Sequence, residues 1–257
     1  MYMEKIAKFH TLETLVLLCM LIICPQAWSL EDEQLSSVSG LAGKYYFGDH
    51  LGSNERLIIQ EDGYYSYKGS RCLGTYAKSA GKASLVNGVL TLKPETASGT
   101  QPSDLIPLKW GDRLYLIDKD EILDFCNEIN QAFEPRKYDE GFTYIREPDW
   151  RKAVTGAPNL PEEWRSFVLK KPLKGKIVCL LDPYVAEIDL GAEDGVRCGM
   201  LLTAHGKGDF TQLCVAIVRR NQCVAVYKYI DSSRSDCCLA KDQIVTSRFH
   251  DWDKGPQ

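Results

Sequence analysis

Cysteine is the residue type in this sequence with the widest reactive chemistry. The chain of 257 residues contains ten cysteines, of which Cys19 and Cys24 lie near its start. The other eight are Cys72, Cys126, Cys179, Cys198, Cys214, Cys223, Cys237 and Cys238. None of them has the Cys-x-x-Cys spacing that favours a metal site, and two adjacent cysteines chelate a metal ion poorly. We therefore predict no metal-binding residues, and disulfides are the main alternative if the compartment is oxidising.

The other reactive residues do not form a recognisable catalytic motif. Neither G-x-S-x-G nor H-E-x-x-H occurs, and the Gly-Lys-Gly-Asp stretch at 206–209 lacks the spacing and setting of a phosphate-binding loop. After the first residues, the histidines are His50, His205 and His250, which lie near expected loops or the chain end. The sequence predicts no catalytic residue and no cofactor. A hydrolase with a dispersed site stays an alternative.

Acidic residues gather at one place, around the start of an expected helix. They are Asp118, Asp120, Glu121, Asp124 and Glu128. A general acid and base could be drawn from such a group. Carboxylates in a first turn also complement the helix dipole, and this structural role accounts for most of them.

The first 29 residues predict the compartment. Two lysines precede an apolar run at 15–24, which would span about 15 Å, or half of a hydrocarbon core. Pro25 ends the run, and Ala27-Trp28-Ser29 fits a small-x-small cleavage site. We expect a signal peptide at 1–29 and an exported protein, periplasmic or extracellular, with no stable membrane span after cleavage. An uncleaved anchor is the alternative.

Bulk properties limit the function further. The formal net charge is −4, and it stays so without the leader, which removes two lysines and two glutamates. A dedicated nucleic-acid binder normally shows a basic balance, so we predict no nucleic-acid partner. The remaining chain suits one large or two small domains.

Residues 36–148 are expected to form the first domain, a β-meander. Short apolar and aromatic runs alternate with turn signals such as Glu61-Asp62-Gly63 and Asn87-Gly88. The expected strands include 44–47, 56–60, 64–67, 82–86, 89–92, 105–110, 113–117 and 142–146, with an exposed loop at 96–103. This spacing is typical of an antiparallel barrel or sandwich.

One helix, at about 121–132, should interrupt the meander. Ile122, Phe125, Cys126 and Ile129 share one face of it, which indicates a core face. Cys72 and Cys126 are the two cysteines of this domain, so they are the candidate disulfide pair of an exported chain. Two free buried thiols are the equal alternative.

The meander loosely resembles lipocalin-like β-barrels, on its Gly-x-Tyr strands and Asp-Gly turns. That resemblance implies a cavity for an apolar ligand. The aromatic residues that would line it are Tyr45, Tyr65, Tyr67, Trp110 and Tyr115, with Tyr46 and Tyr64 nearby. A barrel whose interior is filled by its own side chains is the other interpretation.

A Pro-rich linker at 149–173, with a short helix near 162–169, should lead to a second domain at 174–249. There the I-D-L-G end of one strand is followed by G-V-x-x-G-M. The residues concerned are Ile188, Leu190, Gly191, Gly195, Val196, Gly199 and Met200. This segment resembles the small β-barrel modules of bacterial envelope and flagellar-assembly proteins. The resemblance implies a role in assembly contacts.

A hairpin about Arg220-Asn221 should pair residue i with residue 441 minus i. In that register Cys214 faces Tyr227, Cys223 faces Val218, and the two cysteines share one face of the sheet without reaching each other.

Together these patterns predict a mainly β protein of two small antiparallel domains. The leading hypothesis is a non-enzymatic, exported binding or assembly module of the bacterial cell envelope, with another envelope protein or envelope component as its partner. A lipocalin-like carrier of an apolar ligand is the alternative.

Overall fold

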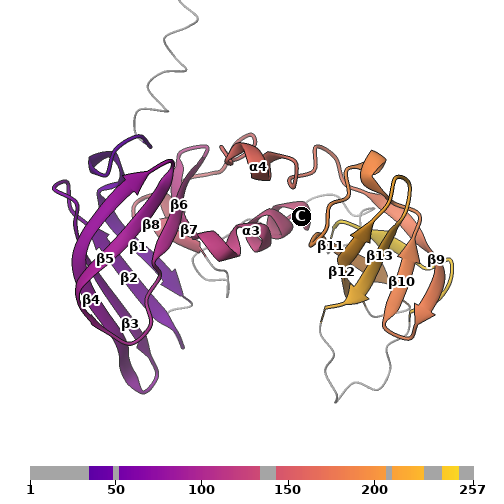
Figure 1. Ribbon diagram of the computed structural model, residues 1–257, viewed down its shortest axis with the longest axis horizontal. Helices are drawn as coiled ribbons and strands as arrows, with labels where there is room; N and C mark the ends of the chain where they lie inside the picture. The colour runs from indigo at the N-terminus through magenta and orange to yellow at the C-terminus, as the bar shows by residue number, and fades with distance from the viewer. Residues whose placement is uncertain (1–34, 49–51, 134–142, 207–209, 229–238, 249–257) are drawn as a thin grey trace, which may run out of the picture.

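The computed structural model describes residues 35–48, 52–133, 143–206, 210–228 and 239–248. Two β-barrels lie on either side of one central helix, α3 (Ile122–Asn130), as Figure 1 shows. The protein is therefore mainly β, with two closed antiparallel barrels and a short helix in the first domain, as the sequence predicts. Among the described residues, the helices are too short or too polar to cross a membrane.

The first barrel is a simple meander in which each strand pairs with the next and β8 returns to β1. Its strands are β1 (Gly43–Gly48), β2 (Asn54–Ile59), β3 (Tyr64–Arg71), β4 (Gly74–Val86), β5 (Val89–Ser98), β6 (Asp104–Trp110), β7 (Arg113–Asp118) and β8 (Thr143–Arg146). Strand β5 runs three residues into the expected loop at 96–103, because Thr96, Ala97 and Ser98 pair with β4.

Alternating side chains fill this barrel. Inward positions carry a buried cluster of aromatic and aliphatic residues, while most outward positions on β2 to β4 are polar or charged, with Ile58 an exposed exception. Its fully buried side chains include Tyr45, Tyr65, Leu57, Leu90, Leu105 and Leu116. The turn before β3 depends on Gly63, whose φ of +79° favours glycine.

A second cluster lies outside the same barrel, on strands β6 to β8. Ile106, Leu108 and Ile117 belong to it, together with the helix residues Phe125 and Cys126. The expected apolar helix face, Ile122, Phe125, Cys126 and Ile129, packs here. Helix α3 follows a short 3-10 turn, η2 (Lys119–Glu121), at whose start the Asp118 carboxylate accepts the Asp120 backbone N–H at 3.1 Å.

The connector runs back over this outer cluster. It contains η3 (Asp149–Arg151) and α4 (Glu162–Arg165), and it contributes Leu160, Trp164 and Phe167 to the packing. Asp149 is fully buried, forms ion pairs with Arg146 and Lys152 at 2.7 Å, and accepts the Leu114 backbone N–H. A paired and hydrogen-bonded carboxylate of this kind ties the connector to strand β7.

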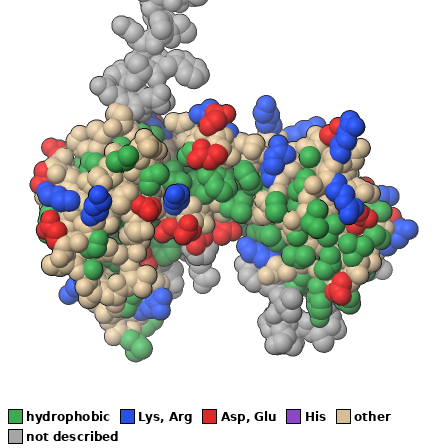
Figure 2. Space-filling view, viewed as in Figure 1, with side chains coloured by type: hydrophobic (Ala, Val, Ile, Leu, Met, Phe, Trp, Pro, Cys, Tyr) green, Lys and Arg blue, Asp and Glu red, His purple; other side chains and the backbone are tan. Residues whose placement is uncertain are grey.

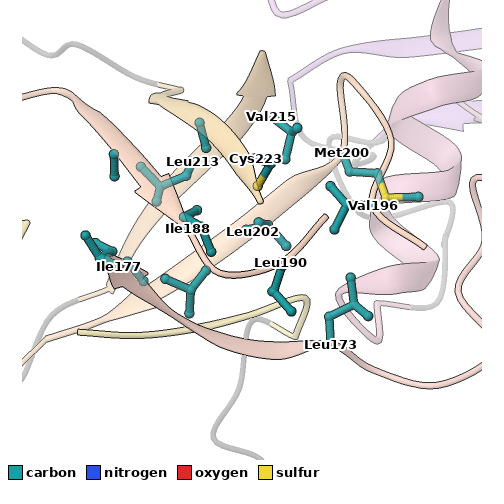
Figure 3. Close-up of a cluster of buried hydrophobic side chains, with 14 of the residues drawn as sticks. Leu173, Ile177, Ile188, Leu190, Val196, Met200, Leu202, Leu213, Val215 and Cys223 are labelled. Atoms are coloured by element: carbon teal, nitrogen blue, oxygen red, sulfur yellow. The ribbon is translucent and has the colours of Figure 1, made fainter. Parts of the chain in front are cut away.

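The second barrel has six strands in the order β10-β13-β12-β11-β14-β9. They are β9 (Lys174–Asp182), β10 (Val185–Ile188), β11 (Leu201–His205), β12 (Phe210–Val218), β13 (Cys223–Tyr227) and β14 (Ile244–Thr246). Figure 3 shows its core, in which Ile177, Ile188, Leu202 and Leu213 point toward one another from different strands.

The β12–β13 hairpin departs from the expected register beyond its turn. Val218 faces Cys223 as predicted, but the ladder shifts by one residue between Val215 and Ile217. Cys214 therefore faces Val226 rather than Tyr227. Because a shift of one residue reverses the side-chain direction, Cys223 lies in the core while Cys214 lies on the other face. The expectation that the two cysteines share one face is wrong.

Two asparagines on α3 join the helix to its neighbours. Asn127 donates to the Gly199 carbonyl at 3.1 Å and accepts the Leu201 N–H at 2.9 Å. One turn later, Asn130 donates to the Phe167 carbonyl at 2.7 Å and accepts the Leu169 N–H at 2.8 Å. Each amide thus pairs with both backbone groups that flank one residue, as a neighbouring strand would. Asn127 fastens the helix to the second barrel, and Asn130 fastens it to the connector.

The contact between α3 and the second barrel is close. A Cβ atom added to Gly199 would lie 2.6 Å from Leu123 Cδ2, and Gly199 has a φ of +84°. Glycine is needed here for both reasons. At the edge of the contact, Lys228 lies 3.8 Å from the Asp124 carboxylate.

Candidate functional site

The five aromatic residues expected to line one cavity do not come together. Tyr45, Tyr65 and Tyr67 face the interior of the first barrel. Trp110 and Tyr115 belong to the outer cluster and contact Phe125 of α3, with ring centroids 6.3 and 5.7 Å apart. The barrel wall separates the two groups, because residues one position apart on a strand point to opposite faces. Position along a strand therefore decides which aromatic rings can meet.

The interior holds a polar cluster that the sequence reading did not identify. The Glu55 carboxylate accepts the Tyr76 hydroxyl at 2.5 Å and also accepts the Tyr144 hydroxyl. Glu55 shares its face of β2 with Leu57 and Ile59, and both of those are buried. The signal that could have found Glu55 is its place in this period-two pattern, at a position otherwise apolar.

The phenols around Glu55 are held in their protonated form. Burial, followed by the nearby Glu55 charge, raises the pKa of Tyr67 and of Tyr144 well above the ordinary value. Burial and the hydrogen bond to Glu55 also raise the pKa of Tyr76. Three donors therefore surround one acceptor, which makes a stable internal network. The cluster offers neither a poised base nor an activated nucleophile.

The candidate disulfide between Cys72 and Cys126 is not formed. Cys72 is exposed in the turn between β3 and β4, whereas Cys126 is fully buried between α3 and the barrel. Burial raises the pKa of the Cys126 thiol to about 12, which makes it an unreactive core residue. In the described part of the chain, free thiols are found at Cys126, Cys179, Cys198, Cys214 and Cys223. Cys237 and Cys238 lie outside the described residues.

The remaining candidates for chemistry have structural partners. His205 Nε2 lies 2.8 Å from Thr246 Oγ1, while His50 and His250 lie outside the described residues. Burial and the neighbouring Asp124 raise the pKa of Glu121. Within the described ranges, no three potential metal ligands lie together.

The second barrel exposes apolar side chains around one turn. Leu180, Leu181, Tyr184 and Val226, which we call the β9–β10 surface, are 40%, 59%, 38% and 36% exposed. They are adjacent, because Val185 pairs with both Asp182 and Val226, and the Tyr184 and Tyr227 rings lie 6.2 Å apart. Figure 2 shows hydrophobic side chains gathered over this barrel. In proteins generally, large exposed apolar patches are often interaction sites.

Comparison with known protein families, with curated proteins and with solved structures gave no match to this chain. The interpretation of its surfaces therefore depends on their own geometry.

Proposed function

We propose that the protein is an exported, non-enzymatic binding module of the bacterial cell envelope, and that its second barrel contacts another envelope protein. The observation that carries this proposal is the β9–β10 surface. Three of its members, Leu180, Leu181 and Val226, are aliphatic and have no polar atom in the side chain to interact with water. Covering them with a partner would remove that apolar area from water.

The packing of both barrels supports a binding role over transport of an apolar ligand inside a barrel. The interior positions of the first barrel are taken by Tyr45, Tyr65, Leu57 and their neighbours, each buried. The core of the second barrel is likewise made of buried side chains. A partner surface on the outside fits packed barrels of this kind better than a ligand cavity does.

Two sequence features support the location. The apolar run at 15–24 and the small-x-small site at 27–29 favour export. The likeness of residues 174–249 to small barrel modules of envelope and flagellar-assembly proteins favours an assembly partner.

The intact mass of the protein tests the expected cleavage: secreted or periplasmic protein should begin at Leu30. A mass that includes residue 1 would contradict cleavage.

The partner contact is tested by photo-crosslinking in the native host. A benzophenone amino acid replaces Leu181 in one variant and Val226 in another. The control replaces Val86, which is 62% exposed but belongs to the first barrel. We expect Leu181 and Val226 to give the same adduct, identified by mass spectrometry as one exported protein, and Val86 to give none.

A second variant keeps that experiment interpretable. Tyr184→Asp places a charge in the surface and should abolish the adduct at position 181 while the melting temperature stays unchanged. The proposal fails if the adducts at 181 and 86 are the same, or if position 181 gives no adduct in correctly exported protein.

A further inference from the structure

A row of three cations crosses the outer face of the first barrel. Arg56 on β2 lies directly opposite Lys68 on β3, and Lys68 lies directly opposite Lys78 on β4. All three are exposed. Because adjacent strands lie about 4.8 Å apart, their Cα atoms span about 10 Å. Like charges placed directly opposite one another destabilise a sheet, so this cation row is an unfavourable arrangement for the barrel alone.

No carboxylate in the described part of the chain forms an ion pair or hydrogen bond with Arg56, Lys68 or Lys78. The same sheet does pair another exposed lysine, since Lys82 lies 3.3 Å from the Asp62 carboxylate. Glu55 is adjacent to Arg56 in sequence but faces the interior, where Tyr76 and Tyr144 donate to it. Within the described ranges, the charge of the cation row therefore has no carboxylate partner.

The cation row borders a groove on the outer face of the barrel. A groove of about 640 Å³ is bordered by Arg56, Lys68 and Lys78. Three residues that carry hydroxyl groups line it as well, Ser66, Thr96 and Ser98, and apolar residues such as Ile58, Ala80 and Ala97 lie between them. Ser98 extends the cation row onto β5, because it pairs with Lys78. Ser66 and Thr96 lie in a parallel row, where both pair with Ala80. Cations and hydroxyls together are the donors that bind phosphate and sulfate oxygens.

We propose that this groove binds a linear polyanion with closely spaced phosphate or sulfate groups. A chain of such groups can place successive oxyanions against Arg56, Lys68 and Lys78 while the hydroxyls donate hydrogen bonds to the same oxygens. The concave shape favours a chain over a lipid headgroup surface, which would meet a flat or convex face more readily. The protein's net charge of −4 makes general attraction of anions an insufficient explanation, so the attraction is local.

The test measures binding of inorganic polyphosphate to the mature protein at low salt. The variant Arg56→Gln/Lys68→Gln/Lys78→Gln removes the cation row. The control Lys170→Gln/Lys171→Gln/Lys174→Gln removes three exposed lysines elsewhere and changes the net charge by the same amount. We expect the first variant to bind about tenfold or more weakly, and the control to bind like the original. Binding should also weaken steeply with salt.

Other outcomes are decisive as well. Equal weakening by both triple variants would overturn the proposal, because it would show that only total charge matters. Orthophosphate binding as tightly as polyphosphate would overturn the requirement for a chain. Vesicles containing anionic lipid that bind through the same three residues more tightly than polyphosphate would replace the proposal with a lipid surface. Dextran sulfate used beside polyphosphate tells which of the two oxyanions is preferred. Circular dichroism establishes that each variant is folded.

Discussion

The interiors of the two barrels are filled by different kinds of side chain. Eight strands enclose the first interior, and four tyrosines, Tyr45, Tyr65, Tyr67 and Tyr144, lie buried in it. Six strands enclose the second, whose fully buried members include Ala186, Ala204 and Ala225. Because the width of a barrel grows with the number of strands, the wider one needs large rings and the narrower one needs small groups. Strand number and core volume are therefore matched in each barrel.

The outer faces differ in a second way. Exposed apolar side chains gather at the β9–β10 surface of the second barrel, whereas the cation row lies on the first. Apolar and ionic interactions respond oppositely to salt, since screening weakens only the ionic ones. The two barrels thus present outer surfaces of different chemistry, and helix α3 of the first domain is bonded to the second barrel through Asn127.

Removing a large ring should affect the first barrel most. Tyr65→Ala takes a fully buried side chain from the wider interior, and we expect a loss of about 3–5 kcal/mol in unfolding free energy. Denaturant titration, followed by a probe in each barrel, measures this. If the second barrel loses as much stability as the first, the two cores unfold as one unit, and the contrast between two separately packed barrels is wrong.

Enlarging a small side chain should destabilise the second barrel, for the opposite reason, because its core is narrow. Ala225→Leu adds volume to a fully buried position in the narrow core, and overpacking should cost about 1–3 kcal/mol. The matched change at an exposed position, Ala216→Leu, should be close to neutral. Thermal unfolding of the two variants checks the difference. A neutral Ala225→Leu would mean that the second core is not tightly filled.

The coupling between the barrels should depend on Asn127. Asn127→Leu replaces the amide with an apolar side chain of similar size and leaves the Gly199 carbonyl and the Leu201 N–H without their partner, which should cost about 1–3 kcal/mol. Asn130→Leu is the matched control, since Asn130 bonds only the connector. Small-angle scattering should show a wider spread of shapes for the first variant alone. Identical profiles would contradict the role of Asn127.

The tyrosine network predicts a sensitivity to alkali. Burial is the main cause that raises the pKa of Tyr45 and Tyr144, so the folded barrel keeps both protonated. Below about pH 10 these phenols are protonated in the unfolded chain as well, so their contribution to the free energy of unfolding is fully present. Above that pH the unfolded chain loses protons that the folded chain retains, and the free energy of unfolding falls. Tyr144→Phe should reduce this fall, at a cost of about 1 kcal/mol at neutral pH. Stability measured from pH 8 to 12 checks both.

Much of the fold could be predicted because it depends on local patterns. Period-two alternation and turn glycines indicated most strands of both barrels, and the spacing of Ile122, Phe125, Cys126 and Ile129 indicated the packed face of α3. The register beyond a bulge could not be predicted. The shift near Ala216 moves Cys214 and Cys223 to opposite faces, and no local signal marks it.

For the candidate surfaces too, some features could be predicted from the sequence and others depend on the tertiary structure. Composition and spacing along the chain were enough to indicate a β protein, an expected leader and the absence of common catalytic motifs. Only the tertiary structure brought Arg56, Lys68 and Lys78 into one row, and only it separated Tyr115 from Tyr65 by a barrel wall. Local sequence specifies which residues alternate on a strand. Which strands lie opposite, and in what register, depends on pairings between distant segments.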